Sequence, residues 1–182
     1  MENKLLSITD QSILFIGVGG CGNNILEYVV THLNGEYMSV AISDDKQTLR
    51  RLGSVSNHIL LSKSKLSEGD AKLLGAMSKQ AKAACIFLGI GGRTGSSVSV
   101  TVLEQLKSFG LVTVVVGTTP FDFETSRLEV VEETLKQLAK ADQLVTFSNQ
   151  KLIGMASKNI SMAESFEMLN QEILGLFTKV LQ

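Results

Sequence analysis

Two glycine-rich stretches carry most of the residues in this sequence that could do chemistry. The first runs from Gly17 to Asn24 (GVGGCGNN) and the second from Gly89 to Ser97 (GIGGRTGSS). Glycine has no Cβ, so such stretches can adopt positive φ and bring backbone amides close to an anion, especially where a helix begins. The second stretch also carries three hydroxyl groups and the cation Arg93, which suit phosphate oxygens. Together these features predict a phosphate-binding site.

The glycines could also have a purely structural role, in tight turns or in close packing of a helix on a sheet. Neither stretch ends in Lys followed by Ser or Thr, so a Walker P-loop is not predicted. Gly17, Gly19 and Gly22 do satisfy the dinucleotide-binding pattern, which expects an acid near the end of the second strand, where Asp44 and Asp45 stand. An NAD-binding Rossmann protein is therefore one alternative.

The elements that must position these stretches alternate between short β-rich runs and longer segments of helical periodicity. Strands are predicted over Ser12–Gly17, Met38–Ser43, Ala84–Leu88, Leu111–Gly117 and Gln143–Phe147. Helices are predicted over Asn24–Leu33, Ala71–Ala83, Gly95–Phe109 and Glu124–Lys140. This alternation predicts an α/β fold, Rossmann-like, with a mostly parallel sheet and helices on both faces. A ligand should bind at the carboxyl edge of the strands.

Composition limits the kind of protein. A chain of 182 residues that is 44% apolar is expected to form a single domain over residues 1–182. Its net charge of -1 provides no basic field to attract nucleic acid or an anionic membrane. Cys21 and Cys85 lack metal-ligand spacing, and no signal peptide or membrane-length apolar run is present. We therefore expect a cytoplasmic protein with no nucleic-acid partner and no membrane insertion.

Six segments of the chain resemble the tubulin/FtsZ family in type, order and spacing. The second glycine stretch is similar to the family's glycine- and threonine-rich signature, and the first is similar to FtsZ's first nucleotide loop. The remaining four segments are Ala41–Leu49, where FtsZ reads Asn-Thr-Asp-Ala-Gln-Ala-Leu, Thr119–Glu124, Ser148–Leu152 and Ser165–Asn170. The resemblance implies the N-terminal GTP-binding domain of an FtsZ-like protein.

The resemblance also implies a ligand and the residues that hold it. The ligand would be GTP or GDP, and Mg²⁺ could accompany GTP. The family's ribose-contacting glutamate corresponds to Glu124, and the residues that face guanine correspond to Phe166 and Asn170. The full predicted binding set is Gly19, Gly20, Cys21, Asn24, Asp45, Gly91, Gly92, Arg93, Thr94, Gly95, Ser96, Glu124, Arg127, Phe166 and Asn170. No catalytic residue and no metal ligand is assigned.

Several of these residues have simpler interpretations. Phe166 lies at helical spacing among apolar residues and could belong to the core. Glu124 could be an acid favoured at a helix N-terminus, and Asp44 and Asp45 could be turn or capping residues. His32 and His58 are isolated, so no arrangement of nucleophile, histidine and acid is predicted.

The sequence also departs from the family pattern. Arg93 and Ser97 stand where the signature has glycine, and Arg93 could either pair with phosphate or block the pocket. The family's long third loop corresponds here to the shorter segment Ser62–Asp70. The basic run after the ribose glutamate keeps one cation, Arg127.

The last departure concerns the end of the sequence. Gln182 falls in what would be the family's central helix, before the loop that carries catalytic acids and before the C-terminal activation domain. The expectation is a protein with little or no autonomous GTP hydrolysis. It would assemble, cap or regulate a filament, either with a tubulin-fold partner or by self-association. The alternative is a degenerate structural relative that no longer binds nucleotide.

Overall fold

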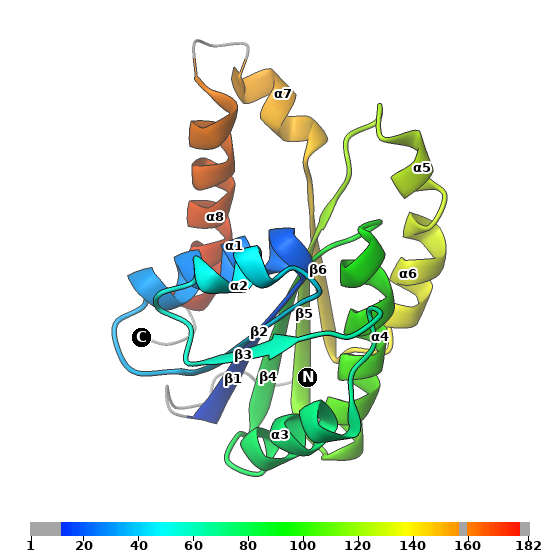
Figure 1. The fold of residues 1–182 in the computed structure, drawn as a ribbon. Coiled ribbons are helices and arrows are strands. Elements are labelled where there is room, and N and C mark those ends of the chain that lie inside the picture. The colour runs from blue at the N-terminus through cyan, green and yellow to red at the C-terminus, as the bar shows by residue number, and fades with distance from the viewer. Residues whose placement is uncertain (1–11, 157–159, 179–182) are drawn as a thin grey trace.

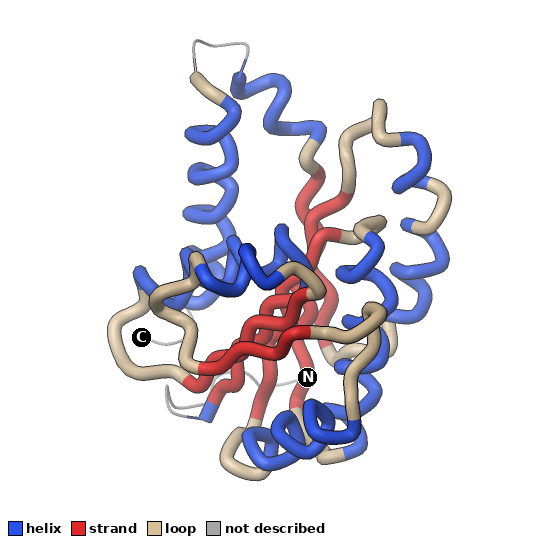
Figure 2. The backbone as a smooth tube through the Cα atoms, viewed as in Figure 1, coloured by secondary structure: helices blue, strands red, loops and turns tan. Residues whose placement is uncertain are grey.

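The computed structural model describes residues 12–156 and 160–178 and shows one six-stranded sheet in the order β3-β2-β1-β4-β5-β6 (Figures 1 and 2). Every strand pairing in this sheet is parallel. The strands are β1 (Ile13–Val18), β2 (Met38–Ser43), β3 (Asn57–Leu60), β4 (Ala83–Gly89), β5 (Val112–Thr119) and β6 (Gln143–Ser148). In this order the chain reverses direction across the sheet between β1 and β4, which is where doubly wound sheets bind their ligands.

Helices cover both faces of the sheet, as predicted. Figure 1 shows α8 beside α1, with α4 and α6 on the other side. One buried apolar cluster joins the sheet to α1 (Gly19–His32), α2 (Lys46–Arg50), α7 (Gln150–Ala156) and α8 (Met162–Thr178). A second joins it to α3 (Glu68–Ser78), α4 (Arg93–Ser108) and α6 (Val131–Leu138). The short α5 (Thr125–Leu128) follows β5 and precedes α6.

An aromatic group fixes α8 against the centre of the sheet. Phe15 of β1 and Phe87 of β4 stack with 6.0 Å between ring centroids, and both rings are fully buried. Phe177 of α8 meets them edge-on at 5.5 and 5.7 Å. Edge-to-face packing of this kind adds to the burial of apolar area. The helix is thereby held beside the two strands that carry the glycine stretches.

The observed elements differ from the predicted ones mainly at helix ends. Strand bounds agree to within two residues, but α1 begins at Gly19 rather than Asn24, so the first glycine stretch forms its opening turn. The helix predicted from Ala71 begins at Glu68, because Ser67 and Asp70 form a capping box. The helix predicted over Glu124–Lys140 is two helices, α5 and α6, interrupted between Leu128 and Val131.

The predicted domain also includes residues 1–11, 157–159 and 179–182, which lie outside the described residues. Within the described ranges, no helix combines the length and the apolar character that a bilayer crossing requires.

Candidate functional site

A pocket of about 320 Å³ lies at the carboxyl edge of the sheet, where the predicted ligand should bind. Loops after β1, β4, β5 and β6 all contribute to it, so it spans the point where the chain reverses across the sheet. Its lining consists of Val18, Gly19, Gly20, Cys21, Gly89, Ile90, Gly92, Arg93, Thr94, Gly95, Thr118, Pro120, Arg127 and Asn149. The volume is within the range of small-molecule sites.

The two glycine stretches face each other across this pocket. Gly19 has φ +72°, and a Cβ placed on it would lie 3.3 Å from the backbone nitrogen of Gly95. Gly19 is the first residue of α1, and Gly95 lies in the first turn of α4. Neither first turn contains an acidic residue, so nothing in those turns neutralises the positive ends of the two helix dipoles. Two helix N-termini at one pocket favour a bound anion.

The second stretch is held in shape by its own side chains and by α5. Gly91 has φ +83°, and its amide donates to Ser96 Oγ at 2.9 Å. A Cβ on Gly91 would come 2.8 Å from the carbonyl oxygen of Arg127, so α5 packs directly on the loop. Both features require glycine at this position. The Ser96 hydroxyl therefore orders the loop, and Gly92, Arg93, Thr94 and Gly95 line the pocket.

The carboxylate of Glu124 has partners within its own loop. Its Oε2 accepts a hydrogen bond from the backbone amide of Phe121 at 2.9 Å, and its Oε1 lies 2.6 Å from Arg127 Nη1. Arg127 lines the pocket, whereas Glu124 is outside its lining. On the same side, Asn149 lines the pocket, and its buried Oδ1 has no hydrogen-bond partner among the described residues. This part of the pocket therefore presents the Arg127 cation, and the Asn149 oxygen beside it is buried.

Cys21 contributes a neutral thiol to the pocket wall. Its Sγ lies 3.2 Å from Thr118 Oγ1, a contact in which either atom could donate. Burial raises the pKa of this thiol and outweighs the opposing effects of the Thr118 hydrogen bond and the nearby Arg127 charge. The pKa of Cys85, inside β4, is raised further by burial alone. Neither cysteine has the lowered pKa of a reactive nucleophile.

The acids after β2 are both bound to the protein itself. Asp44 Oδ2 accepts from Thr94 Oγ1 at 3.0 Å, which joins the end of β2 to the start of α4. Asp45 is the N-cap of α2 and accepts from the amides of Gln47 and Thr48 at 2.8 and 3.3 Å. The Asp45 bonds satisfy the first amides of α2, so this acid has a structural role as a helix cap.

Some of the predicted residues lie away from the pocket lining. Asn24 is exposed on α1, while its neighbour Asn23 is buried and donates from Nδ2 to the Ile42 carbonyl at 3.0 Å. Phe166, with 37% of its surface exposed, and the half-buried Asn170 are four residues apart on α8 and share one face of that helix. Their contact with guanine, like that of Asn24 and Asp45 with a nucleotide, stays a prediction.

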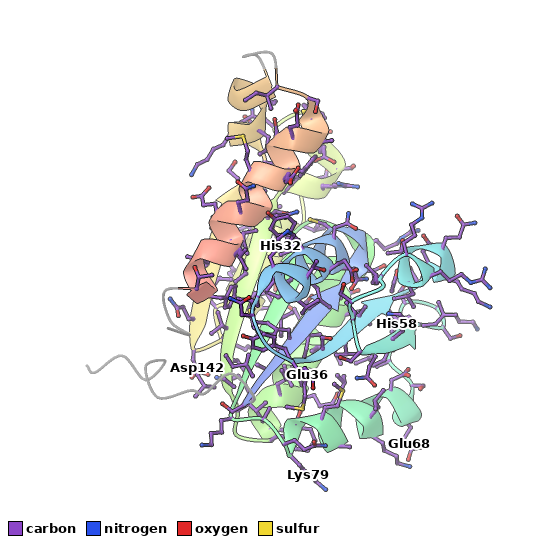
Figure 3. The ribbon with its side chains drawn as sticks, turned by 90° about the vertical axis from the view of Figure 1, so that its left-hand side faces the viewer. His32, Glu36, His58, Glu68, Lys79 and Asp142 are labelled. Atoms are coloured by element: carbon purple, nitrogen blue, oxygen red, sulfur yellow. The ribbon has the colours of Figure 1, made fainter. Side chains whose placement is uncertain are left out.

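In the described part of the chain, no group of three or more His, Cys, Asp or Glu residues is arranged to hold a metal ion. Figure 3 shows the two histidines well apart, with His32 at the end of α1 and His58 on β3. The His32 ring stacks on Tyr28 at 4.1 Å, which gives it a structural contact.

Comparisons with known proteins bear directly on this pocket. Residues 70–157 match the family model "Tubulin/FtsZ family, GTPase domain". The cell division protein FtsZ of Buchnera aphidicola subsp. Baizongia pistaciae is 33% identical over 183 residues, covering 90% of this chain and 46% of the relative. The chain belongs to the tubulin/FtsZ superfamily. The corresponding protein of Coxiella burnetii is 31% identical over 188 residues, covering 91% of this chain and 47% of that protein.

Solved tubulin/FtsZ structures agree with this fold. An FtsZ dimer from M. jannaschii superposes with a TM-score of 0.75 at 28% identity, covering 91% of this chain and 53% of that one. CetZ from Methanosaeta thermophila, at 21% identity and a TM-score of 0.73, supports the fold alone. The chain spans about half the length of the curated relatives it matches. The predicted fold class and family are thus confirmed. The first glycine stretch is accounted for by this family, without the alternative of an NAD-binding Rossmann protein.

Six residues that line the pocket are absent from the predicted binding set. Three of them, Val18, Gly89 and Ile90, belong to the two glycine stretches, and the other three lie outside these stretches. Thr118, Pro120 and Asn149 come from the ends of β5 and β6. Their place in the sequence could have indicated them, because each lies where a predicted parallel strand ends, and ligands bind at the carboxyl edge of such a sheet. The sequence pattern at Asp44 favours a turn or a cap, and its bond to Thr94 depends on β2 lying next to β1 in the sheet.

Proposed function

We propose that this chain binds a guanine nucleotide, GTP or GDP, with the phosphates against the two glycine stretches. One observation supports this most strongly: α1 and α4 begin at the same pocket, with Gly19 beside Gly95. Backbone amides at two helix N-termini, without acids in either first turn, form a site for a di- or triphosphate. The superfamily match supports a guanine rather than a nicotinamide nucleotide.

The pocket suggests a direction for the nucleotide. Arg127 of α5 and Asn149, which follows β6, line one part of the pocket, and Glu124 forms an ion pair with Arg127. We place the ribose toward this side, with Phe166 and Asn170 of α8 as the proposed partners of guanine. The phosphates would then run toward Gly19, Arg93 and Thr94. Mg²⁺ accompanying GTP would be held chiefly by phosphate oxygens and water, with the Thr94 hydroxyl as a neighbouring oxygen.

Phosphate binding is also favoured by the charges that line the pocket. Arg93 and Arg127 line it, and within the described ranges no acidic side chain does so. An arginine can make two parallel hydrogen bonds to phosphate, each stronger than a neutral hydrogen bond. Arg127 is partly engaged by Glu124, so Arg93, on the exposed end of α4, is the cation more available to a ligand.

We further propose that nucleotide binding serves filament assembly or its regulation, through a tubulin-fold partner or through further copies of this chain. The curated relatives are named as cell division proteins, and one structural neighbour of 12% identity, TubZ of Bacillus thuringiensis serovar israelensis, was solved as GDP-form protofilaments. Next to the pocket, Phe123, Leu128 and Val130 are 70%, 38% and 44% exposed. An apolar rim beside a nucleotide is suited to contact with another protein. The proposal includes two roles for the chain, as a filament subunit or as a cap at a filament end.

A second candidate is a structural relative in which Arg93 occupies the phosphate position and nucleotide no longer binds. Calorimetric titration separates the two. We expect GDP and GTP to bind in the micromolar range, ADP at least about tenfold more weakly, and NADH not at all, since a base-specific site discriminates by such factors. Absence of GDP and GTP binding to the wild type and to Arg93→Gly would overturn the nucleotide proposal. Binding that appears only in Arg93→Gly would favour the blocked pocket.

A further inference from the structure

Asp44 places a carboxylate beside the phosphate end of the proposed site. A single oxygen, Oδ2, accepts from Thr94 Oγ1 at 3.0 Å and from Ser64 Oγ at 2.9 Å. Thr94 is buried in the first turn of α4 and lines the pocket, so the carboxylate lies one hydrogen bond away from the pocket wall.

The same carboxylate holds an unusual turn. Ser62 and Lys65 form an antiparallel bridge around Lys63 and Ser64, whose φ values are +52° and +53°. Non-glycine residues seldom adopt this left-handed conformation, and two in succession need support from their surroundings. The hydrogen bond from Ser64 to Asp44 provides it. Asp44 thus joins this turn, the end of β2 and the phosphate loop.

Arg93 brings the opposite charge to the same place. It directly precedes Thr94, lines the pocket and has no ion pair with any of the described residues. Burial alone would raise the pKa of Asp44, but the bonds from Ser64 and Thr94, a backbone hydrogen bond and the Arg93 charge lower it overall. Asp44 is therefore ionised at neutral pH, and its charge and that of Arg93 are present together.

We propose that Asp44 and Arg93 act as an opposed pair that sets the preference of this pocket between nucleoside diphosphate and triphosphate. The inference rests on the proposed nucleotide function and on phosphates that run from the β5 side toward Thr94. The terminal phosphate of a triphosphate comes closest to Asp44, which repels it, and to Arg93, which attracts it. A diphosphate ends before it reaches the carboxylate and is affected less by both charges.

The test compares affinities for GDP and for a non-hydrolysable GTP analogue, GMPPNP, in EDTA so that no metal bridges carboxylate and phosphate. Asp44→Asn keeps an oxygen that can accept from Thr94 and Ser64, so the loop contacts survive while the charge is lost. We expect GMPPNP affinity to rise about tenfold relative to GDP affinity in Asp44→Asn, and to fall about tenfold in Arg93→Gln, as expected for one charge interaction at close range. The double variant should return near the wild-type ratio.

Matched controls are available in this chain. Glu36 is exposed in the loop before β2, at the opposite end of the strand that Asp44 follows, and is labelled in Figure 3. Glu36→Gln and Arg50→Gln, the latter on the exposed surface of α2, remove the same charges away from the pocket and should leave the ratio unchanged. Thermal melting checks that each variant is folded.

The outcomes separate this inference from the proposal beneath it. If GDP and GMPPNP bind but their ratio is unchanged in Asp44→Asn or in Arg93→Gln, the opposed pair is wrong and the nucleotide function stands. If the ratio moves equally in the Glu36 and Arg50 controls, the effect is general electrostatics and the inference falls. If the wild type binds neither nucleotide, both proposals fail.

Discussion

Gly22 of α1 packs directly against the carbonyl group of Phe87 in β4, so that a Cβ on Gly22 would overlap that carbonyl oxygen. This contact brings the first turn of α1 down onto the sheet beside the strand that carries the second glycine stretch. The absence of a side chain at Gly22 lets α1 approach β4 this closely, and the two glycine stretches consequently meet at one pocket.

Substitution of this glycine should be severe, and a matched control lies two residues away. A Cβ on Gly20 meets no atom within 4 Å, and Gly20 also lies in α1. We expect Gly22→Ala to lower the free energy of unfolding by about 3 kcal/mol or more through backbone overlap. Gly20→Ala should be neutral or stabilising by up to about 1 kcal/mol, from helix propensity. Urea denaturation measures both, and equal effects would contradict the close packing of Gly22 on β4.

Arg127 should matter for binding more than for stability. Its pairing with Glu124 joins two side chains that are 56% and 20% exposed, and such pairs contribute only about 0–1 kcal/mol. We therefore expect Arg127→Met to change the free energy of unfolding by less than about 1 kcal/mol, while GDP affinity falls about five- to tenfold through loss of a charged hydrogen bond. Arg50→Met is the control, and the same loss of affinity there would rule out a specific role.

Cys21 offers a chemical probe of the pocket. Cys21 is partly buried at the pocket wall, whereas Cys85 is buried inside the sheet. Because the pKa of Cys21 is raised, N-ethylmaleimide should label it slowly at neutral pH and faster as the pH rises. GDP should protect it, as measured by intact mass, and Cys85→Ala should label like the wild type. Labelling of Cys21 that saturating GDP does not slow would place the nucleotide elsewhere.

Asp142 should make stability depend on pH. Its Oδ2 accepts from the amide and the hydroxyl of Thr113, both at 2.8 Å, and lies 3.7 Å from Lys107 Nζ. The Thr113 amide bond lowers the pKa most; burial opposes it, and the Thr113 hydroxyl and Lys107 lower it further. A lowered folded-state pKa means that the stabilisation is present above the unfolded value of about 4 and is lost as pH falls through the folded value.

Asp142→Asn tests this directly. Because the carboxylate is about half exposed, we expect a loss of only about 1 kcal/mol at pH 7, after allowing for solvent screening. The difference from the wild type should shrink as the pH falls through the lowered folded-state pKa of Asp142, because the protonated carboxyl group then carries no more charge than asparagine. Urea denaturation at several pH values measures it. A wild-type advantage that grew on acidification would contradict the assigned sign, and Glu36→Gln should show no such pH dependence.

Strands and their order of appearance could be predicted because buried parallel strands such as Ala83–Gly89 are apolar on both faces. The start of α1 could not be predicted, because Gly19, Gly20 and Gly22 are poor helix formers. The close packing of Gly22 on Phe87, which holds this turn against the sheet, is seen only in the folded chain. The same limit applies to the site. The glycine stretches indicate a phosphate site through residue type, but the Asp44–Thr94 bond joins residues 50 positions apart and depends on the assembled sheet.

The proposed function requires the amides at the start of α1 and of α4 to bind the phosphates of one nucleotide. Backbone amide NMR of the ¹⁵N-labelled protein titrated with GDP tests this most directly. We predict that the amides of Gly19–Cys21 and Gly92–Gly95 shift together and saturate at one GDP per chain, while the amide of Glu36, before β2, does not move. Saturable GDP binding that leaves either glycine stretch unshifted would contradict the proposal.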